Sequence, residues 1–190
     1  MGDIRTHIIG LPRCGSAWLA TALNELPGVR AFHDAIEGKA SSSEYFDFLE
    51  EQQKNYSHVV DVSPSILHFP QVIDRILHAQ EGSIILIKRN VIKARGAWLQ
   101  KLIDSGFEKN NLTGFNKVWS DALVQLDKIA SERRFSIRFE NELFTPAALR
   151  SIAAFIRVLP EEGWAEKWPM YKVDQQFTLK EALSAVYPAE

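Results

Sequence analysis

The chain has 190 residues, 46% of them hydrophobic and 24% charged. This length and composition are typical of one globular domain with a sizeable core, and they exclude a disordered chain. A net charge of −2 provides no overall attraction to nucleic acid or to an anionic membrane, so any basic site must be local.

The single cysteine excludes an internal disulfide and a zinc site made only of cysteines. It fits a reducing compartment. The N-terminal residues lack the long apolar core of a signal peptide, and no apolar run is long enough to span a bilayer. We therefore expect a cytoplasmic protein, a single domain over residues 1–190, with neither nucleic acid nor membrane as a partner. The sequence does not specify an oligomeric state.

Short apolar runs alternate with helical patterns along the chain. The predicted strands cover residues 6–10, 29–33, 59–62, 83–87 and 135–139. The predicted helices cover 15–26, 44–55, 70–79, 91–103, 113–133 and 146–158, and the last thirty residues are expected to lie over the core as a short helix and loops. Each strand is almost continuously apolar, which is typical of a parallel sheet buried on both faces. We predict an α/β fold of three layers, with a central parallel sheet of about five strands and helices on both faces.

The turn after the first strand has the composition of an anion-binding loop. Gly10 and Gly15 allow backbone amides to face inward, and the following helix adds its free N–H groups and its positive dipole end. Arg13 can grip a phosphate or sulfate through two hydrogen bonds, and Ser16 supplies a hydroxyl or an N-cap. The glycine spacing matches a Walker loop, but Ser16 stands where the lysine belongs, which argues against an ATPase or GTPase. An ordinary strand-to-helix turn is the structural alternative.

The carboxyl ends of parallel strands meet at one edge of a sheet, where ligands bind in α/β proteins. This rule collects the Arg13 loop, His33, Asp34, Ser63 and Arg89 at the same edge.

The segment Pro12–Trp18, with the sequence PRCGSAW, resembles the 5′-phosphosulfate loop of the sulfotransferases, Pro-(Lys/Arg)-Ser-Gly-(Thr/Ser)-(Thr/Ser)-(Trp/Leu). These enzymes use 3′-phosphoadenylyl sulfate (PAPS) as sulfuryl donor, and the scheme requires no metal. The resemblance implies a P-loop fold and donor binding through Arg13, Cys14, Gly15, Ser16, Ala17 and Trp18. Arg13 would hold the 5′-phosphosulfate and stabilise the transition state with help from Ser16. Trp18 has two interpretations, packing on the helix face or stacking on the adenine.

A second segment, beginning at Arg89, resembles the family's 3′-phosphate site, Arg-(Asp/Asn)-Pro-x-x-x-x-x-Ser. The resemblance implies that Arg89 binds this phosphate. Val91 replaces the proline, and Ala97 occupies the position of the serine. The candidates that can replace the lost hydroxyl are Lys88, Lys93 and Arg95.

Two further segments agree with the family's order. Residues 136–160 resemble its late strand and helix, which extends the resemblance over residues 6–160. Residues 61–64 resemble its (Glu/Asp)-Lys-Ser-Pro turn, with Val62 in place of the lysine and Ser63 still able to donate a hydrogen bond. The segment can equally be a Ser-Pro turn that ends a strand.

The catalytic base is expected at the end of the second strand. Transfer requires a base near the acceptor, and family members carry a histidine or a glutamate in this region. His33 and Asp34 are the candidates, with Glu37 as a third, and a purely structural role for His33 is the alternative. Beside Arg13 and a helix N-terminus, the pKa of Cys14 is expected to be depressed, which would make the thiol reactive.

Together these motifs predict a sulfotransferase that moves a sulfuryl group from PAPS to a hydroxyl or amine of a small-molecule or glycan acceptor. Four departures from the family pattern, at Cys14, Ala17, Val62 and Ala97, keep two alternatives open. One is a catalytically inactive nucleotide- or anion-binding protein of the same fold. The other is a nucleotide-kinase-like phosphotransferase.

Overall fold

The computed structural model describes residues 4–78, 82–108, 111–131, 135–138 and 145–168. Its strands are β1 (Ile4–Gly10), β2 (Val29–His33), β3 (His58–Val62), β4 (Ser83–Lys88) and β5 (Phe135–Arg138). Its helices are α1 (Ser16–Leu23), α2 (Ser42–Gln53), α3 (Pro70–His78), α4 (Val91–Asp104), α5 (Leu112–Ser131), α6 (Pro146–Phe155) and α7 (Trp164–Lys167), with a 3-10 turn, η1, at Ser65–His68. The predicted α/β class and the alternation of strands with helices are confirmed.

All five strands pair in parallel in the order β2-β3-β1-β4-β5. From β1 the chain crosses to β2, toward one edge of the sheet. From β4 it crosses to β5, toward the opposite edge. In open parallel sheets, loops that diverge from neighbouring strands leave a crevice beyond the carboxyl ends. The order places that crevice beyond β1 and β4.

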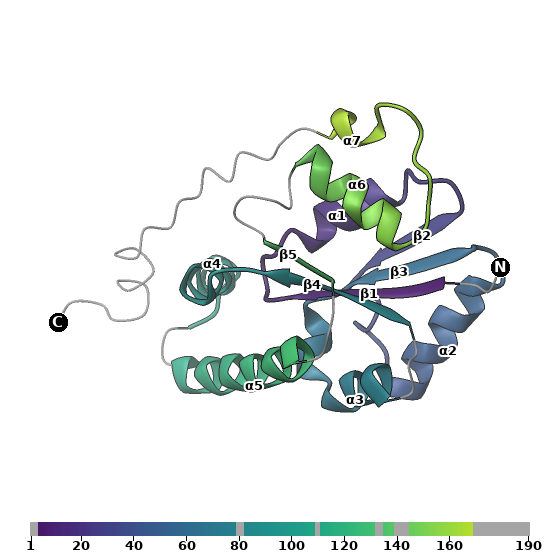
Figure 1. The fold of residues 1–190 in the computed structure, drawn as a ribbon. Coiled ribbons are helices and arrows are strands. Elements are labelled where there is room, and N and C mark those ends of the chain that lie inside the picture. The colour runs from purple at the N-terminus through teal and green to yellow at the C-terminus, as the bar shows by residue number, and fades with distance from the viewer. Residues whose placement is uncertain (1–3, 79–81, 109–110, 132–134, 139–144, 169–190) are drawn as a thin grey trace.

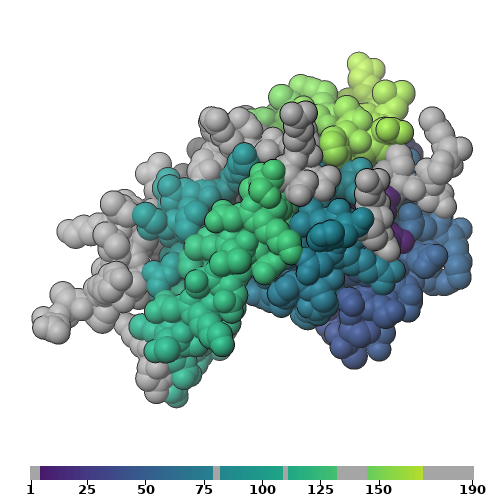
Figure 2. Space-filling model, turned by 60° about the horizontal axis from the view of Figure 1, so that its bottom comes forward, coloured from purple at the N-terminus to yellow at the C-terminus, as the bar shows by residue number. Residues whose placement is uncertain are grey.

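Helices cover both faces of the sheet. Figure 1 shows α1, α6 and α7 on one face, α2, α3 and α5 on the other, and α4 beside one end of the sheet. Figure 2 shows the green α5 lying over the teal part of the chain, with the yellow-green α6 and α7 at the top of the same view. Among the described helices, none is both long and apolar enough to cross a lipid bilayer.

The strands β1, β2, β3 and β4 contribute to two hydrophobic cores because successive side chains point to opposite faces. In β4, Ile85 and Ile87 pack with α1 and α6, whereas Ile84 and Leu86 pack with α2, α3 and α5. This two-sided burial explains why the strand is an unbroken apolar run and not an alternating one.

The C-terminal part of the described chain closes one of these cores. Trp164 of α7 is buried, and its indole N–H donates to the carbonyl of Ala22 in α1 at 3.2 Å. A short helix over the core was predicted here. Tyr171 and Phe177, which belong to the same prediction, lie outside the described residues.

Two local elements differ from the prediction. Helix α1 ends at Leu23, three residues early, because the Asn24 side chain pairs with both the N–H and the carbonyl of Ala31, at 2.9 and 2.7 Å. The turn η1 was not predicted. It follows Pro64, whose carbonyl accepts from the Leu67 N–H at 3.2 Å.

Candidate functional site

The loop between β1 and α1 has the backbone of an anion site. Arg13 and Gly15 both adopt the left-handed conformation, with φ of 68° and 79°. Left-handed residues in a turn can direct neighbouring amides toward one point, and α1 adds the free N–H groups of its first turn. The N-cap is Gly15 and not Ser16, which is the first residue of the helix. Ser16 is therefore not a cap, and its hydroxyl lies in the first helical turn.

Cys14 faces the protein interior. It is 1% exposed, and a side chain at Gly10 would meet its sulfur at 3.1 Å and Ile87 at 3.0 Å. A Cβ at position 10 would therefore force Ile87 and Cys14 to move by a few tenths of an ångström. Burial raises the pKa of the thiol to about 12, although the Arg89 charge and the amides of Cys14 and Ser16 oppose the rise. The expectation of a depressed pKa and a reactive thiol is wrong, because desolvation outweighs the nearby positive charge.

Arg89 lies against this loop. Its guanidinium donates a hydrogen bond to the carbonyl oxygen of Arg13. The next residue, Asn90, caps α4 by accepting from the Lys93 N–H at 3.0 Å, so α4 begins two residues after the arginine, at Val91. The structure thus brings together the two arginines that the separate motifs single out, one from each of two neighbouring strands.

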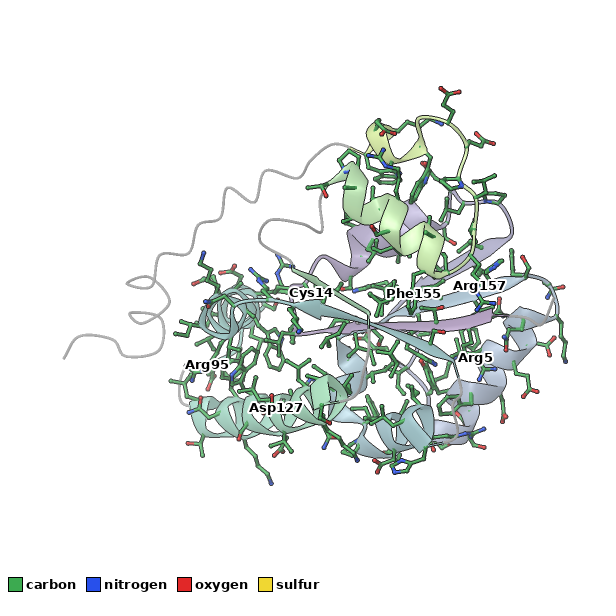
Figure 3. The ribbon with its side chains drawn as sticks, viewed as in Figure 1. Arg5, Cys14, Arg95, Asp127, Phe155 and Arg157 are labelled. Atoms are coloured by element: carbon green, nitrogen blue, oxygen red, sulfur yellow. The ribbon has the colours of Figure 1, made fainter. Side chains whose placement is uncertain are left out.

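The other predicted partners of Arg89 are arranged less favourably. Ala97 is 8% exposed and packs in α4 without a polar group. Arg95 bonds the Asn116 side chain at 2.6 Å and stacks over Phe115 at 5.6 Å, so its charge is directed to α5. Figure 3 shows Arg95 on that side of α4, and Cys14 at the end of the sheet opposite Arg5. Lys88 and Lys93 are exposed.

Trp18, half-buried on α1, meets Trp168 edge to face at 6.1 Å between ring centroids. Of its two interpretations, the packing contact is therefore present. Ala17 is exposed beside it.

The second strand ends in a pair of polar residues. The Nε2 of His33 lies 3.1 Å from Oδ2 of Asp34. The other oxygen of Asp34, Oδ1, accepts from the Ser63 hydroxyl at 2.9 Å and from the Ser65 N–H at 3.0 Å. Ser63 therefore donates a hydrogen bond, as predicted, but to Asp34. Val62 is buried in the core against α1.

A second buried carboxyl supports this corner from below. Asp61 accepts from the Ala35 N–H at 3.0 Å and from the Tyr45 hydroxyl at 2.7 Å. Since Tyr45 donates to Asp61, it accepts from Nδ1 of His7 at 3.0 Å. Burial raises the pKa of Asp61 to about 7, against the effect of its two donors. Asp61 lies inside the protein and anchors the turn that follows Asp34.

The site residues form two groups at the carboxyl edge. Arg13 and Arg89 lie at β1 and β4, and His33 and Asp34 lie at the end of β2. Because β3 separates β2 from β1, the second group lies about 10 Å across the sheet from the Arg13 loop, and farther from Arg89 on β4. Burial is the main cause of the raised pKa of Cys14, and the charge of Asp34 adds to it.

Sequence reasoning missed two members of this corner. Ser65 donates its N–H to Asp34 and its hydroxyl to Glu37 at 3.1 Å, and Tyr45 reaches Asp61 from α2. Ser65 lies in the unpredicted turn η1, and Tyr45 has only the pattern of an apolar helix face. Neither position carried a sequence signal for a polar contact.

No family model and no curated protein matches the chain. Solved structures do, and sulfotransferases are among them, so the chain has the P-loop fold of the sulfotransferases. The sulfotransferase from Alicyclobacillus acidocaldarius matches with a TM-score of 0.61 and 16% identity over 97% of this chain and 91% of that one. Mouse sulfotransferase SULT7A1, crystallised with PAP, matches with a TM-score of 0.61 and 16% identity over 97% of this chain. The sulfotransferase domain of the curacin biosynthetic pathway matches with a TM-score of 0.59 and 17% identity over 86% of this chain and 77% of that domain.

The chain spans 66% of the mouse protein. At 16–17% identity these likenesses describe the fold alone. They confirm the predicted fold and leave the reaction to the residues of the site.

Proposed function

We propose that this protein is a sulfotransferase that moves a sulfuryl group from PAPS to a hydroxyl or amine of a small-molecule or glycan acceptor. The observation that carries the proposal is the hydrogen bond from Arg89 to the Arg13 carbonyl. It joins the two segments that resemble the two halves of a sulfotransferase donor site, although 76 positions separate them in the sequence.

The donor set at this edge is suited to an anion. Amides of a left-handed loop, the first turn of α1, the Ser16 hydroxyl and two guanidinium groups are all donors. Arg13 would bind the phosphosulfate and stabilise the charge that develops on the leaving oxygen, with Ser16 assisting. PAPS, when bound, supplies the sulfuryl group and the nucleotide that leaves.

The two halves of this site fit the donor unequally. The Arg13 loop fits the 5′-phosphosulfate because its recognition uses backbone amides, which the replacements at Cys14 and Ala17 leave in place. The 3′-phosphate half keeps Arg89 but has no hydroxyl at Ala97. Lys88 and Lys93 remain as exposed cations near the start of α4.

On the acceptor side, His33 is the proposed base. Its side chain is 46% exposed, so a substrate can reach the ring. It lies about 10 Å across the sheet from the loop, with the end of β3 between them. An acceptor bound over that strand end would place its hydroxyl between the base and the donor. As in phosphoryl transfer, most of the catalysis would come from positioning and electrostatics.

One observation favours a second function. Ala97 and Val62 are both buried apolar residues where the family pattern has polar ones. A protein that binds a nucleotide or anion in the same fold without catalysis would tolerate both replacements.

A thermal-shift titration tests the donor site. Adenosine 3′,5′-bisphosphate at a hundred times its dissociation constant should stabilise the fold by about 2.7 kcal/mol. For a chain of this size, that corresponds to a rise of roughly 5–10 °C in the midpoint. Sulfate alone should give a much smaller shift, and a larger shift with ATP and magnesium would instead indicate a kinase-like protein.

Turnover distinguishes the two remaining functions. Sulfuryl transfer from PAPS to any member of a panel of phenols, alcohols, amines and glycans would support the enzyme. A bisphosphate shift without transfer to the whole panel would support the binding protein. Absence of any bisphosphate shift would contradict both.

A further inference from the structure

The two candidates for the base, His33 and Asp34, occupy different environments. Asp34 is 8% exposed, and both of its oxygens already face donors. Oδ1 accepts two hydrogen bonds, from the Ser63 hydroxyl and the Ser65 N–H, and Oδ2 faces Nε2 of His33. With three of its roughly four acceptor positions occupied and its side chain buried, this carboxylate is poorly placed to receive a substrate proton. His33, by contrast, has an exposed ring with one nitrogen engaged.

The backbone around Asp34 is also fixed. Asp34 adopts a left-handed conformation, with φ of 54°, which aspartate and asparagine tolerate better than most other residues. Its N–H donates to the Val62 carbonyl at 3.3 Å, and the following N–H, of Ala35, donates to the buried Asp61. Neighbouring structure therefore determines both the position and the direction of the Asp34 carboxylate.

The contact between the two residues determines where the proton of the neutral ring lies. Nε2 of His33 is 3.1 Å from a carboxylate oxygen, which can only accept, so Nε2 must carry the hydrogen. Nδ1 then carries the lone pair. The hydrogen bond that one ring nitrogen of a histidine makes sets the protonation of the other nitrogen. Here Asp34 accepts that hydrogen bond from Nε2.

We propose that Asp34 is a positioning residue that holds His33 as the Nε2–H tautomer and makes Nδ1 the base atom of the reaction. The inference rests on the proposed function for the base role, and on the geometry alone for the tautomer. Asp34 also stabilises the imidazolium that forms when Nδ1 takes a proton.

The resulting step is balanced. The acceptor hydroxyl gives its proton to Nδ1 of His33 while its oxygen forms a bond to the sulfur of the donor. The bond between that sulfur and the phosphate oxygen of the nucleotide breaks, and its electron pair leaves on the phosphate oxygen. Solvent then takes the proton from His33, which restores the neutral ring.

The variant Asp34→Asn tests this arrangement without a change of size. Asparagine tolerates the left-handed conformation. Its amide oxygen would stay with the donors Ser63 and Ser65, which leaves its NH2 group facing Nε2 of His33. Nε2 would then have to accept, the ring would change to the Nδ1–H tautomer, and the base atom would be lost.

Nitrogen NMR of the histidine side chains reads the tautomer directly and requires no turnover. In the wild-type protein above pH 8, we expect His33 to show a protonated Nε2 and an unprotonated Nδ1, identified by the loss of these signals in His33→Gln. In Asp34→Asn, Nδ1 should be the protonated nitrogen and Nε2 the unprotonated one. The matched control is Asp47→Asn, the same substitution at an exposed position of α2, which should change neither signal.

Two results would overturn the proposal. One is an Nδ1–H tautomer of His33 in the wild-type protein, which decides the question even if Asp34→Asn does not fold. The other is an Asp34→Asn variant that binds adenosine 3′,5′-bisphosphate normally and keeps the wild-type tautomer.

Kinetics tests the base role separately. Asp34→Asn should lower kcat by roughly 100-fold or more at an unchanged KM for PAPS, because general-base catalysis contributes about that much. A kcat within threefold of wild type would exclude Nδ1 as the base. Absence of transfer by the wild-type protein would remove the proposed function and the base role with it, while the NMR signals would still show whether Asp34 sets the tautomer.

Discussion

The loop after β1 and the segment from β4 into α4 form the two halves of the same edge, but they depart from the sulfotransferase pattern in different ways. In the loop, the replaced residues are Cys14, which faces the core, and Ala17, which faces solvent. The backbone that would bind an anion is intact. In α4, a buried methyl group at Ala97 stands where the family pattern has a hydroxyl.

The difference shows which kind of recognition tolerates substitution. A site made of backbone amides depends on φ and on close packing, so its side chains can change as long as glycine remains at positions 10 and 15. A site made of a side-chain hydroxyl is lost when that one atom is lost. The two halves should therefore respond separately in thiol reactivity, turnover and nucleotide binding. The expected fold-changes are largest in the interior of the loop and smallest in the helix α4.

The first prediction concerns the interior side of the loop. With a pKa of about 12 against 9.0 for a free thiol, Cys14 should react with a thiol reagent at pH 8 roughly a thousandfold more slowly in the native than in the unfolded protein. Because the native pKa is the higher one, this ratio should narrow only as the pH rises from about 9 toward 12. Labelling is measured by absorbance with and without urea. Ala17→Cys in a Cys14→Ser background is the exposed control and should react quickly.

If native Cys14 instead reacts within tenfold of the unfolded rate, the loop must open in solution. The close packing of Cys14 against Gly10 would then not describe the working conformation.

The second prediction concerns the exposed side of the same loop. Arg13→Ala should lower kcat/KM for PAPS by roughly 100-fold or more, because it removes charged donors at the point where negative charge develops. It should also weaken the binding of both adenosine 3′,5′-bisphosphate and adenosine 5′-monophosphate. Arg157→Ala is the matched control, an exposed arginine that also has a left-handed φ, of 60°. Figure 3 labels it far from Cys14.

The third prediction separates the halves. Arg89→Ala should weaken the binding of the bisphosphate by roughly 10- to 150-fold, since one charged hydrogen bond contributes about 1.5–3 kcal/mol. The affinity for the monophosphate should fall less, because this nucleotide lacks the 3′-phosphate. Arg95→Ala, whose guanidinium is bound to Asn116, should leave both affinities near wild type. Equal losses for the two nucleotides in Arg89→Ala would mean that Arg89 acts only through the Arg13 carbonyl.

The fourth and smallest effect is a gain. Ala97→Ser restores a hydroxyl at the family position, and one added hydrogen bond should tighten the bisphosphate by roughly fivefold. The affinity for the monophosphate should not change. Calorimetry with both ligands measures the ratio of the two affinities. A ratio that stays the same would show that α4 does not face the 3′-phosphate in this protein.

Much of the fold follows from local patterns. The strand at residues 29–33 and the helix that begins at Pro70 agree with the prediction because apolar periodicity and a proline in the first turn are local signals. The end of α1 differs from the prediction, because Asn24 pairs with Ala31, and this contact depends on the course of β2. The turn η1 had no periodic signal because it is only four residues long.

The candidate site divides in the same way. The sequence by itself singled out Arg13, Ser16, His33, Asp34 and Arg89 as candidates, because parallel strands end at one edge and each of these residues lies at or beyond the end of a strand. Only the tertiary structure decided what each residue faces. Arg13 and Cys14 are neighbours in the chain, yet one is exposed and the other is buried with a raised pKa.

His33 and Asp34 are also adjacent, yet one has an open ring and the other is enclosed by two serines from beyond β3. The physical reason is that exposure and hydrogen bonding depend on strand order and on the turn between two residues. Exposure and hydrogen bonding are therefore non-local properties, whereas the residue types that allow the chemistry can be read directly from the sequence.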